Sequence, residues 1–230
     1  MTVAESIIST MRKNGKRFYA CDNISEYLNE QTINSLIDEA TLKFKDVLET
    51  LLIDVENDPN SNDTARRLAK MYFNEIMSGR YYPEPKITAF PNGEDGDPYS
   101  GMLVVRAEIT SLCSHHHQTV KGVAYIGILP KEKVLGLSKY VRIAQHLARR
   151  GTLQEELCQS IRKAISNRTG TDDVAVYIEA THGCVENRGV EAHNSLTQTI
   201  SLGGVFMTDI RNKEEFFHNI QLQSMASNRR

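Results

Sequence analysis

The chain has 230 residues, which is enough for one domain with a large buried core, or for one domain and a helical extension. Hydrophobic residues make up 40% of it and charged residues 24%, a composition that excludes a wholly disordered protein. Its 27 basic and 29 acidic residues give a net charge of −2, without the basic excess typical of proteins that bind nucleic acids. We therefore expect no nucleic-acid partner.

The first residues and the cysteines bear on where the protein works. Residues 1–8 show no basic region followed by an apolar one, and no segment approaches the roughly 18 uninterrupted apolar residues of a membrane span. We therefore expect a cytoplasmic protein with no membrane partner. In that reducing compartment the four cysteines are expected to be free thiols or metal ligands. They are Cys21, Cys113, Cys158 and Cys184.

The first third of the chain has the residue spacing of helices. Residues 3–13 form a short amphipathic stretch, and apolar residues recur at helical intervals over residues 32–52. After a polar loop, Asp63 or Thr64 is placed to cap a third helix that runs through Ile76, and Gly79 is a natural stop signal. We assign residues 1–82 to an N-terminal helical region.

The rest of the chain alternates between patterns typical of strands and of helices. Strands are predicted over 102–109, 120–129, 174–180 and 195–206, and helices over 134–149, 153–167 and 213–222. Two strands, two helices and two further strands make an α+β catalytic domain over residues 83–223. Residues 224–230 are predicted to form a flexible tail.

Sulfur and imidazole side chains recur at the ends of two predicted strands. Cys113 and His116 have the C-x-x-H spacing, which lets a tight turn present both side chains to one metal ion. His182 and Cys184 are two residues apart, so in an extended chain they point to the same side, which Arg188 would share if the extension continued. Sulfur combined with imidazole favours zinc over magnesium or calcium.

Two kinds of zinc site fit these residues. Cys113, His116 and Cys184 make a three-ligand site with a fourth position for water, whose pKa the metal lowers toward about 7. Such a site is suited to hydrolysis. The alternative is a structural site in which the protein supplies a fourth ligand. The candidates for that ligand are His115, His182 and Cys158.

Two further clusters have polar side chains suited to a nucleotide. Ser138, Lys139 and Arg142 lie at the start of a predicted helix, where free backbone amides and a shared basic face favour a polyphosphate. The alternative for this cluster is a solvated basic face. Gln154 and Glu155 open the next helix. A carboxylate there can accept hydrogen bonds from the N1–H and 2-amino groups of guanine, or it can simply occupy the first helical turn.

Several of these segments, in their order along the chain, resemble the GTP cyclohydrolase I family. The resemblance covers roughly residues 63–220, whereas residues before about 32 match nothing recognisable. The helical segment 67–79 and the stretch 85–88 also look like that family. The more specific motifs are Cys113-Ser-His-His116, Ile126-Gly-Ile-Leu-Pro130, Gly136-Leu-Ser-Lys-Tyr-Val-Arg142, Gln154-Glu155, Glu179-Ala-Thr-His-Gly-Cys184, Arg188-Gly189 and Ser201-Leu-Gly-Gly-Val-Phe206.

The resemblance implies a zinc (Zn²⁺) enzyme whose site residues are carried over by position. The metal ligands would be Cys113, His116 and Cys184. The histidines that handle protons beside the five-membered ring of the purine would be His115 and His182. The guanine would be anchored by Glu155, with Gln154 beside it. The triphosphate would be held by Ser138, Lys139, Arg142 and Arg188, with Arg67 assisting.

The same resemblance implies a reaction and an assembly. GTP would be hydrolysed at C8 with ring opening, formate release and recyclisation to 7,8-dihydroneopterin triphosphate, which feeds folate, other pterins or 7-deazaguanine nucleosides. The fold would be a tunnelling fold, an antiparallel sheet with helices on one face, preceded by the N-terminal helices. Neighbouring subunits would join their sheets into the toroidal barrel of a homodecamer, with active sites at the subunit interfaces.

Two other functions stay open at this point. A tunnelling-fold relative that acts on a modified (7-deaza)purine would need a nucleophilic cysteine and a nicotinamide partner, and the complete ligand set with His182 argues against it. A non-catalytic purine-binding protein would carry a structural zinc with four protein ligands and would turn nothing over. Ser114 stands where the family usually has an acidic residue, which removes one negative charge near the metal but no ligand.

Overall fold

The computed structural model describes residues 1–93 and 96–227, and the chain divides into two compact units. The first unit holds Met1–Pro83 together with Arg149–Gly151. The second holds Glu84–Ala148 and the chain from Thr152 onward. The boundary after Pro83 is one residue from the boundary expected after residue 82, but the first unit also takes three residues from the middle of the chain.

The first unit begins with helices that have well-formed N-termini. α1 (Val3–Lys13) starts at a capping box, in which the Glu5 amide donates to Thr2 Oγ1 and the Thr2 amide donates to Glu5 Oε2. A single turn, η1 (Ser25–Tyr27), precedes α2 (Glu30–Thr50). The side chain of Asn29 caps α2 by accepting from the Thr32 amide at 2.8 Å.

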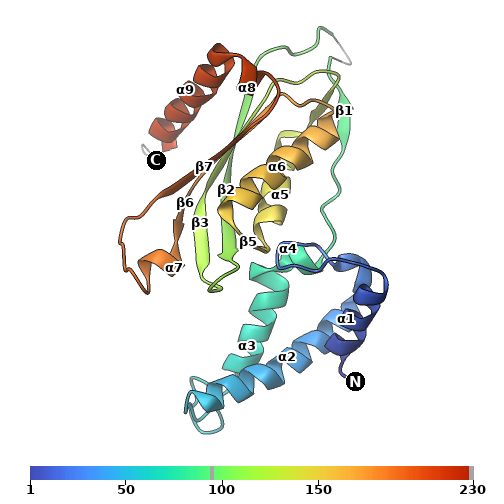
Figure 1. Ribbon diagram of the computed structural model, residues 1–230, viewed down its shortest axis with the longest axis vertical. Coiled ribbons are helices and arrows are strands. Elements are labelled where there is room, and N and C mark those ends of the chain that lie inside the picture. Colours follow the sequence, from blue (N-terminus) through green and yellow to red (C-terminus); the bar gives the residue numbers. More distant parts are fainter. Residues whose placement is uncertain (94–95, 228–230) are drawn as a thin grey trace. The chain divides into compact units, whose positions relative to one another are not determined.

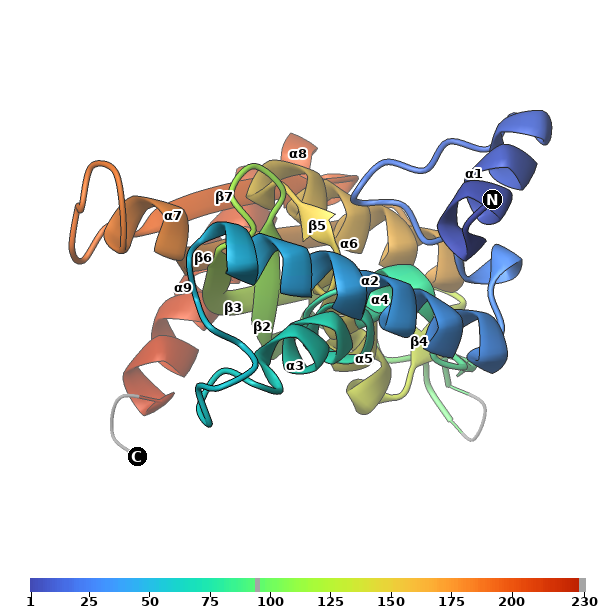
Figure 2. The ribbon, with the colours of Figure 1, turned by 90° about the horizontal axis from the view of Figure 1, so that it is seen from below.

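The third predicted helix of this unit is divided in the structure. It runs as α3 (Thr64–Lys70), then as the π-helical segment η2 (Met71–Ile76), and a further turn, α4 (Ser78–Tyr81), follows. Figure 2 shows α2 and α3 side by side, and Ile33 and Ile37 of α2 form one buried cluster with Ala69 of α3. This contact buries apolar residues of α2, which recur at intervals of three and four residues along one side of the helix.

Gly79 does not stop a helix, so that prediction is wrong. It lies inside α4 and is buried, and its carbonyl accepts hydrogen bonds from Asn23 Nδ2 at 2.9 Å and Arg150 Nε at 2.9 Å. A helix needs a C-terminal glycine when its last carbonyls lack partners. Here two side chains that are distant in sequence satisfy that carbonyl.

The second unit is built on an antiparallel sheet. Its strands are β2 (Leu103–Cys113), β3 (Thr119–Ile128), β6 (Val174–His182), β7 (Thr197–Leu202) and the two-residue β5 (Gly151–Thr152), of which only Thr152 is assigned to this unit. Their order is β5-β2-β3-β6-β7 (Figure 1). Leu112 pairs with Thr119, and Val120 pairs with His182. The end of β2, the start of β3 and the end of β6 therefore meet at one end of the sheet.

One face of this sheet is covered by two helices. α5 (Leu137–Ala148) and α6 (Gln154–Thr169) pack on it through a core that includes Tyr140 and Ile161, both fully buried. The strands contribute every second residue to this core, Ala124 and Ile126 from β3 among them. The resulting apolar cluster fixes α6 against β6 and β7, which matters below because α6 begins beside the candidate site.

The opposite face is also covered, so the expectation of helices on one face only is wrong. Tyr125, Ala175 and Tyr177 point to that side and pack with Phe206 of α8 (Val205–Thr208) and Phe216 of α9 (Ile210–Ser227). Figure 1 shows α9 on the side of the sheet away from α5 and α6. The reason is that both sets of alternating strand residues are apolar here, and each set needs a partner. The α+β class itself is as expected.

Three other boundaries differ from the sequence-based expectation. The predicted strand 195–206 is only β7, because Gly203 and Gly204 turn the chain into α8. The predicted helix 134–149 is preceded by β4 (Lys133–Leu135), which pairs with β1 (Ala89–Pro91). α9 extends to Ser227, so residues 224–227 of the expected tail are helical, while 228–230 lie outside the described residues. No helix in the described ranges is long and apolar enough to cross a membrane.

Candidate metal centre

A tight turn at the end of β2 places the first two candidate ligands. Cys113 is the last residue of β2 and is buried, with 6% of its surface exposed. Its amide donates to the Gln118 carbonyl at 2.9 Å, and the His117 amide donates to the Cys113 carbonyl at 2.9 Å. His117 adopts a positive φ of 51°, a conformation that closes the turn. The ring of His116 is thereby folded back beside the Cys113 thiol.

The third candidate ligand comes from a helical turn, which corrects the extended chain expected over 182–188. β6 ends at His182, and Cys184 lies in α7 (Gly183–Glu186). Gly183 is buried, and a Cβ there would approach the Thr119 carbonyl oxygen to 3.1 Å. The chain turns at this point because glycine permits the close packing of α7 on the start of β3.

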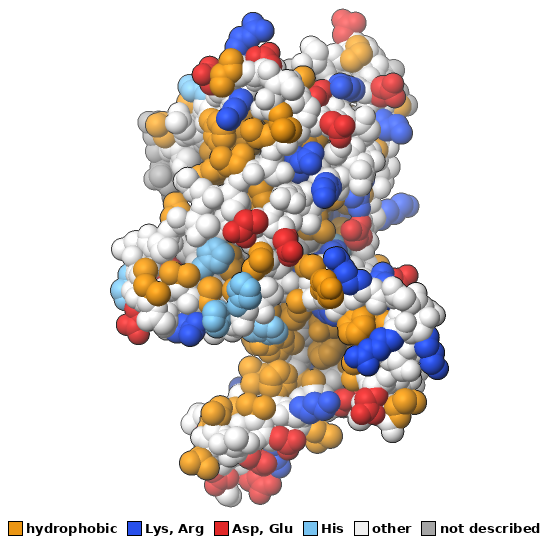
Figure 3. Space-filling view, in the orientation of Figure 1, with side chains coloured by type: hydrophobic (Ala, Val, Ile, Leu, Met, Phe, Trp, Pro, Cys, Tyr) orange, Lys and Arg blue, Asp and Glu red, His pale blue; other side chains and the backbone are white. Residues whose placement is uncertain are grey.

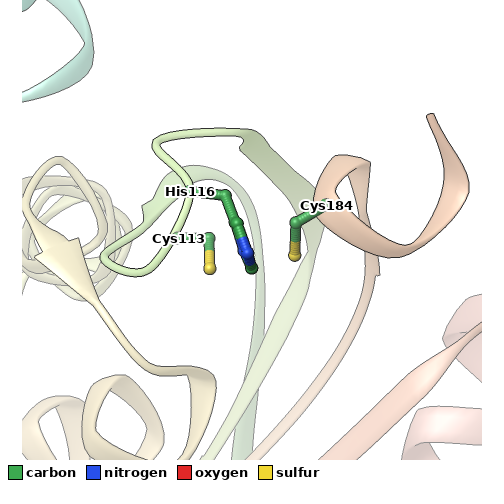
Figure 4. A group of neighbouring side chains, drawn as sticks. All are labelled: Cys113, His116 and Cys184. Carbon is green, nitrogen blue, oxygen red and sulfur yellow. The ribbon is translucent and has the colours of Figure 1, made fainter. Parts of the chain in front are cut away.

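The three side chains converge. One ligand atom from each of Cys113, His116 and Cys184 lies within 4.8 Å of the others, and Figure 4 shows the three side chains extending side by side in the same direction. Within residues 1–93 and 96–227, no other group of three or more metal-ligating side chains of this kind is found. Two sulfurs and one imidazole nitrogen are the donors that zinc prefers. The cluster therefore fits a zinc ion.

The proposed fourth protein ligands are not part of this cluster as the structure describes it. Cys158 lies on α6, where its sulfur contacts the carbonyls of Val176 at 3.4 Å and Thr199 at 3.7 Å. His115 is exposed beside His116, with 6.2 Å between the ring centroids. Three protein ligands favour the open kind of zinc site over the structural kind.

The charge environment of Cys184 is set by its burial and its neighbours. Burial raises the pKa of the Cys184 thiol, the hydrogen bond and charge of Cys113 raise it further, and Arg188 lowers it. A bound cation is the natural counter-charge for two neighbouring thiolates, because metal binding displaces their protons. Arg188 belongs to the same electrostatic environment although it is exposed.

His182 lies next to the cluster and is held by Gln154. Its Nε2 is 2.7 Å from Gln154 Oε1. Burial lowers the pKa of His182, while the carboxylates of Glu155 and Glu186 act in the opposite direction. Histidine side chains gather on the face seen in Figure 3. The sequence analysis did not single out Glu186. Its position two residues after Cys184 could have indicated that it lies near the candidate site.

The basic cluster lies elsewhere in the second unit. Leu137, the first residue of α5, lines the same cleft as Leu103 and Arg106 at the start of β2. Ser138 and Lys139 follow directly, whereas Cys113 ends β2. Arg106 lies seven positions before Cys113, which corresponds to about 23 Å at about 3.3 Å per strand residue. Within one chain, Ser138 and Lys139 therefore lie toward the opposite end of β2 from the metal cluster.

The remaining predicted residues have local partners or open surroundings. Lys139 donates from Nζ to the Lys86 carbonyl at 3.1 Å, and Arg142 is exposed one turn further along α5. Arg67 lies in the first unit, where its Nε is 3.2 Å from Asp63 Oδ2. Glu155 is exposed in the first turn of α6.

The fold and the cluster together define a class of protein. It is an α+β protein with a Cys-His-Cys group suited to a metal ion that supports hydrolysis. The sequence profile of the GTP cyclohydrolase I family matches residues 41–221. The chain is 44% identical to GTP cyclohydrolase 1 of Aeromonas hydrophila over 177 residues, which cover 76% of this chain and 79% of that protein. It is 36% identical to GTP cyclohydrolase 1 of Aliivibrio salmonicida over 221 residues, which cover 95% and 93%. The chain belongs to the GTP cyclohydrolase I family and is an enzyme.

These comparisons confirm the family resemblance and extend it toward the N-terminus. The family profile begins at residue 41, before the limit near residue 63 expected from the motifs, and the Aliivibrio alignment includes most of the N-terminal helices. Among solved structures, archaeosine synthase QueF-Like in its apo form overlaps 47% of this chain and 97% of its own, at 13% identity and a TM-score of 0.40. That overlap supports no statement about function.

Proposed function

We propose that the protein is a zinc-dependent enzyme that hydrolyses GTP at C8, releases formate and forms 7,8-dihydroneopterin triphosphate. The observation that carries the proposal is the convergence of Cys113, His116 and Cys184, with ligand atoms within 4.8 Å, beside His182 in a chain of this family. The product is the starting compound for folate, other pterins or 7-deazaguanine nucleosides. A zinc ion held by these ligands would supply an activated water molecule for the hydrolysis.

The surrounding side chains have the chemistry that the reaction requires. His182 would give a proton to N7 of the purine, which makes C8 more electrophilic, and His115 would assist the later proton transfers. Imidazole suits this work because its ordinary pKa is closest to neutrality. Glu155, exposed in the first turn of α6, would accept hydrogen bonds from the N1–H and 2-amino groups of guanine.

The triphosphate would be held by basic and hydroxyl side chains, and their positions bear on the assembly. Arg188 lies near Cys184, but Ser138 and Lys139 lie at the start of α5, which shares a cleft with the beginning of β2, whereas Cys113 is the last residue of that strand. The two groups meet around one GTP molecule most simply when they come from different chains. The remaining proposed contacts are Arg142 and, as an assisting residue, Arg67.

We therefore propose active sites between subunits of a homodecamer, in which tunnelling folds join into a toroidal barrel. Two features of the described chain support an assembly of this kind. The sheet ends in β7, an edge strand with backbone groups available for pairing. In addition, α2 exposes large apolar side chains, with 67% of Leu42 and 54% of Val47 accessible.

The test is to incubate the zinc-loaded protein with GTP and to measure formate and pterin products by mass spectrometry. Formate together with 7,8-dihydroneopterin triphosphate is expected. The matched variant His182→Ala should keep its zinc but lose ring opening by about 10²-fold or more, because it removes the proton donor. Unchanged GTP, with zinc bound to the wild-type protein, would overturn the proposed activity and favour a modified purine substrate or a binding role.

A further inference from the structure

The carboxamide of Gln154 is one of the few buried polar side chains of the second unit, with 6% of its surface exposed. It is the first residue of α6, and its Nε2 lies within hydrogen-bond distance of acceptors on two strands. These are the Ile178 carbonyl at 3.2 Å, the Thr197 carbonyl at 3.1 Å and Thr199 Oγ1 at 3.2 Å. Gln154 therefore ties the start of α6 to β6 and β7.

These contacts determine which end of the amide faces which group. A carbonyl oxygen only accepts hydrogen bonds, so the end that faces the Ile178 and Thr197 carbonyls must be the NH2 group. The other end, Oε1, then faces His182 Nε2 at 2.7 Å. Oε1 carries no hydrogen, and the contact is a hydrogen bond only if His182 Nε2 donates.

We infer that Gln154 is a positioning residue that fixes the orientation and the tautomer of His182, with the proton on Nε2 and Nδ1 left as the basic nitrogen. This deepens the proposed function, on which it rests for its catalytic consequence, and it gives Gln154 a role different from guanine binding. The amide hydrogens of Gln154 are directed to the strands, so they are not offered to a base. With Nε2–H donated to Gln154, Nδ1 has the lone pair that can take up a proton and then pass it to N7 of the purine. In the other tautomer Nδ1 already carries its hydrogen and cannot take up that proton, and catalysis falls accordingly.

The chain offers a matched control one helical turn away. Cys158 lies four residues after Gln154 on the same helix, and its thiol contacts the carbonyls of Val176 and Thr199 on the same two strands. Its contacts are to these strands, and His182 is not among them. Cys158→Ala thus measures what a lost contact between α6 and the sheet does by itself.

The experiment compares Gln154→Met, Cys158→Ala and wild type, all zinc-loaded. The readouts are zinc content, kcat and KM for GTP, and ¹⁵N NMR of histidine-labelled protein, with the His182 signal identified by its loss in His182→Ala. In wild type we expect His182 protonated on Nε2. In Gln154→Met we expect proton occupancy at Nδ1, a fall in kcat of about tenfold or more and a KM within about threefold of wild type. Cys158→Ala should stay within about twofold in kcat.

Three results would overturn the inference. The first is an unchanged tautomer of His182 in Gln154→Met. The second is a raised KM with an unchanged kcat, which would make Gln154 a guanine ligand. The third is an equal loss of kcat in Gln154→Met and Cys158→Ala, which would leave only a structural role. If wild type turns over no GTP, the proposed function fails, yet the NMR comparison still decides the tautomer.

Discussion

Among the glycines in the described part of the fold, Gly204 is the one where an added Cβ would come closest to a charged side chain. It follows β7 with φ 50° and ψ −130°, a conformation that side chains disfavour. A Cβ built on it would lie 2.0 Å from Asp173 Oδ1. That carboxylate is 7% exposed, accepts from the Val205 amide at 2.9 Å and pairs with Lys131 at 3.0 Å. Gly204→Ala should therefore be strongly destabilising.

The magnitude follows from two contributions to the free energy of unfolding. The unfavourable backbone conformation costs about 1–3 kcal/mol for a residue with a Cβ. Displacing Asp173 breaks a hydrogen bond from the Val205 amide to a charged acceptor, which is worth about 1.5–3 kcal/mol. Together they predict a loss of about 4 kcal/mol. Gly170→Ala is the matched control, since Gly170 also has a positive φ, of 72°, but no described atom lies within 4 Å of its added Cβ.

Gly170→Ala should cost about 1 kcal/mol, so the two variants should differ by about 3 kcal/mol, or about 6–12 °C in Tm. Thermal unfolding followed by circular dichroism, at one protein concentration and with zinc saturated, measures the difference. In an Asp173→Ala background the cost of Gly204→Ala should fall, because the contact with Oδ1 is gone, and what stays is the conformational part and the 2.9 Å contacts of the added Cβ with the Asp172 and Asp173 backbone. The reasoning would be refuted by equal Tm values for the two glycine variants. It would also be refuted if Gly204→Ala lowered Tm as much in the Asp173→Ala background as in wild type.

Three further predictions concern the candidate site. Cys184→Ser should lose bound zinc and GTP turnover together, as measured by metal analysis and formate release; turnover with a full zinc content would contradict the ligand assignment. Glu155→Ala should raise KM for GTP by about tenfold or more and weaken the preference for GTP over ATP, and an unchanged preference would remove Glu155 from guanine recognition. Arg142→Ala and Cys184→Ser, each inactive alone, should regain formate release when co-expressed as mixed oligomers; no recovery in verified mixed oligomers would argue that each site is built within one chain.

The elements with one strong local pattern were predictable. Residues 3–13 were expected to be helical and form α1 with those limits, because amphipathic spacing and a capping sequence act within one segment. The C-x-x-H spacing likewise indicated that Cys113 and His116 would meet, since a turn brings them together locally. The family followed from several motifs in order, and the comparisons confirm it.

The features that escaped the sequence depend on packing between distant segments. The helical turn at Cys184 arises where Gly183 packs against Thr119, and an isolated strand pattern does not reveal that contact. α9 covers the second face because Tyr125 and Tyr177 need apolar partners there. The hydrogen bond between Gln154 and His182 joins residues 28 positions apart, so no local pattern predicts it.

The three residues Arg149–Gly151 have a practical consequence for anyone who divides this protein. They lie between α5 and α6 in sequence but belong to the first unit, so the backbone passes between the units at three junctions. In the intact chain, Arg150 donates to the carbonyls of Gly79 at 2.9 Å and Cys21 at 3.3 Å. A fragment that begins at residue 84 would deprive Arg150 of both acceptors. Truncations and chimaeras should therefore exchange residues 149–151 along with the first 83.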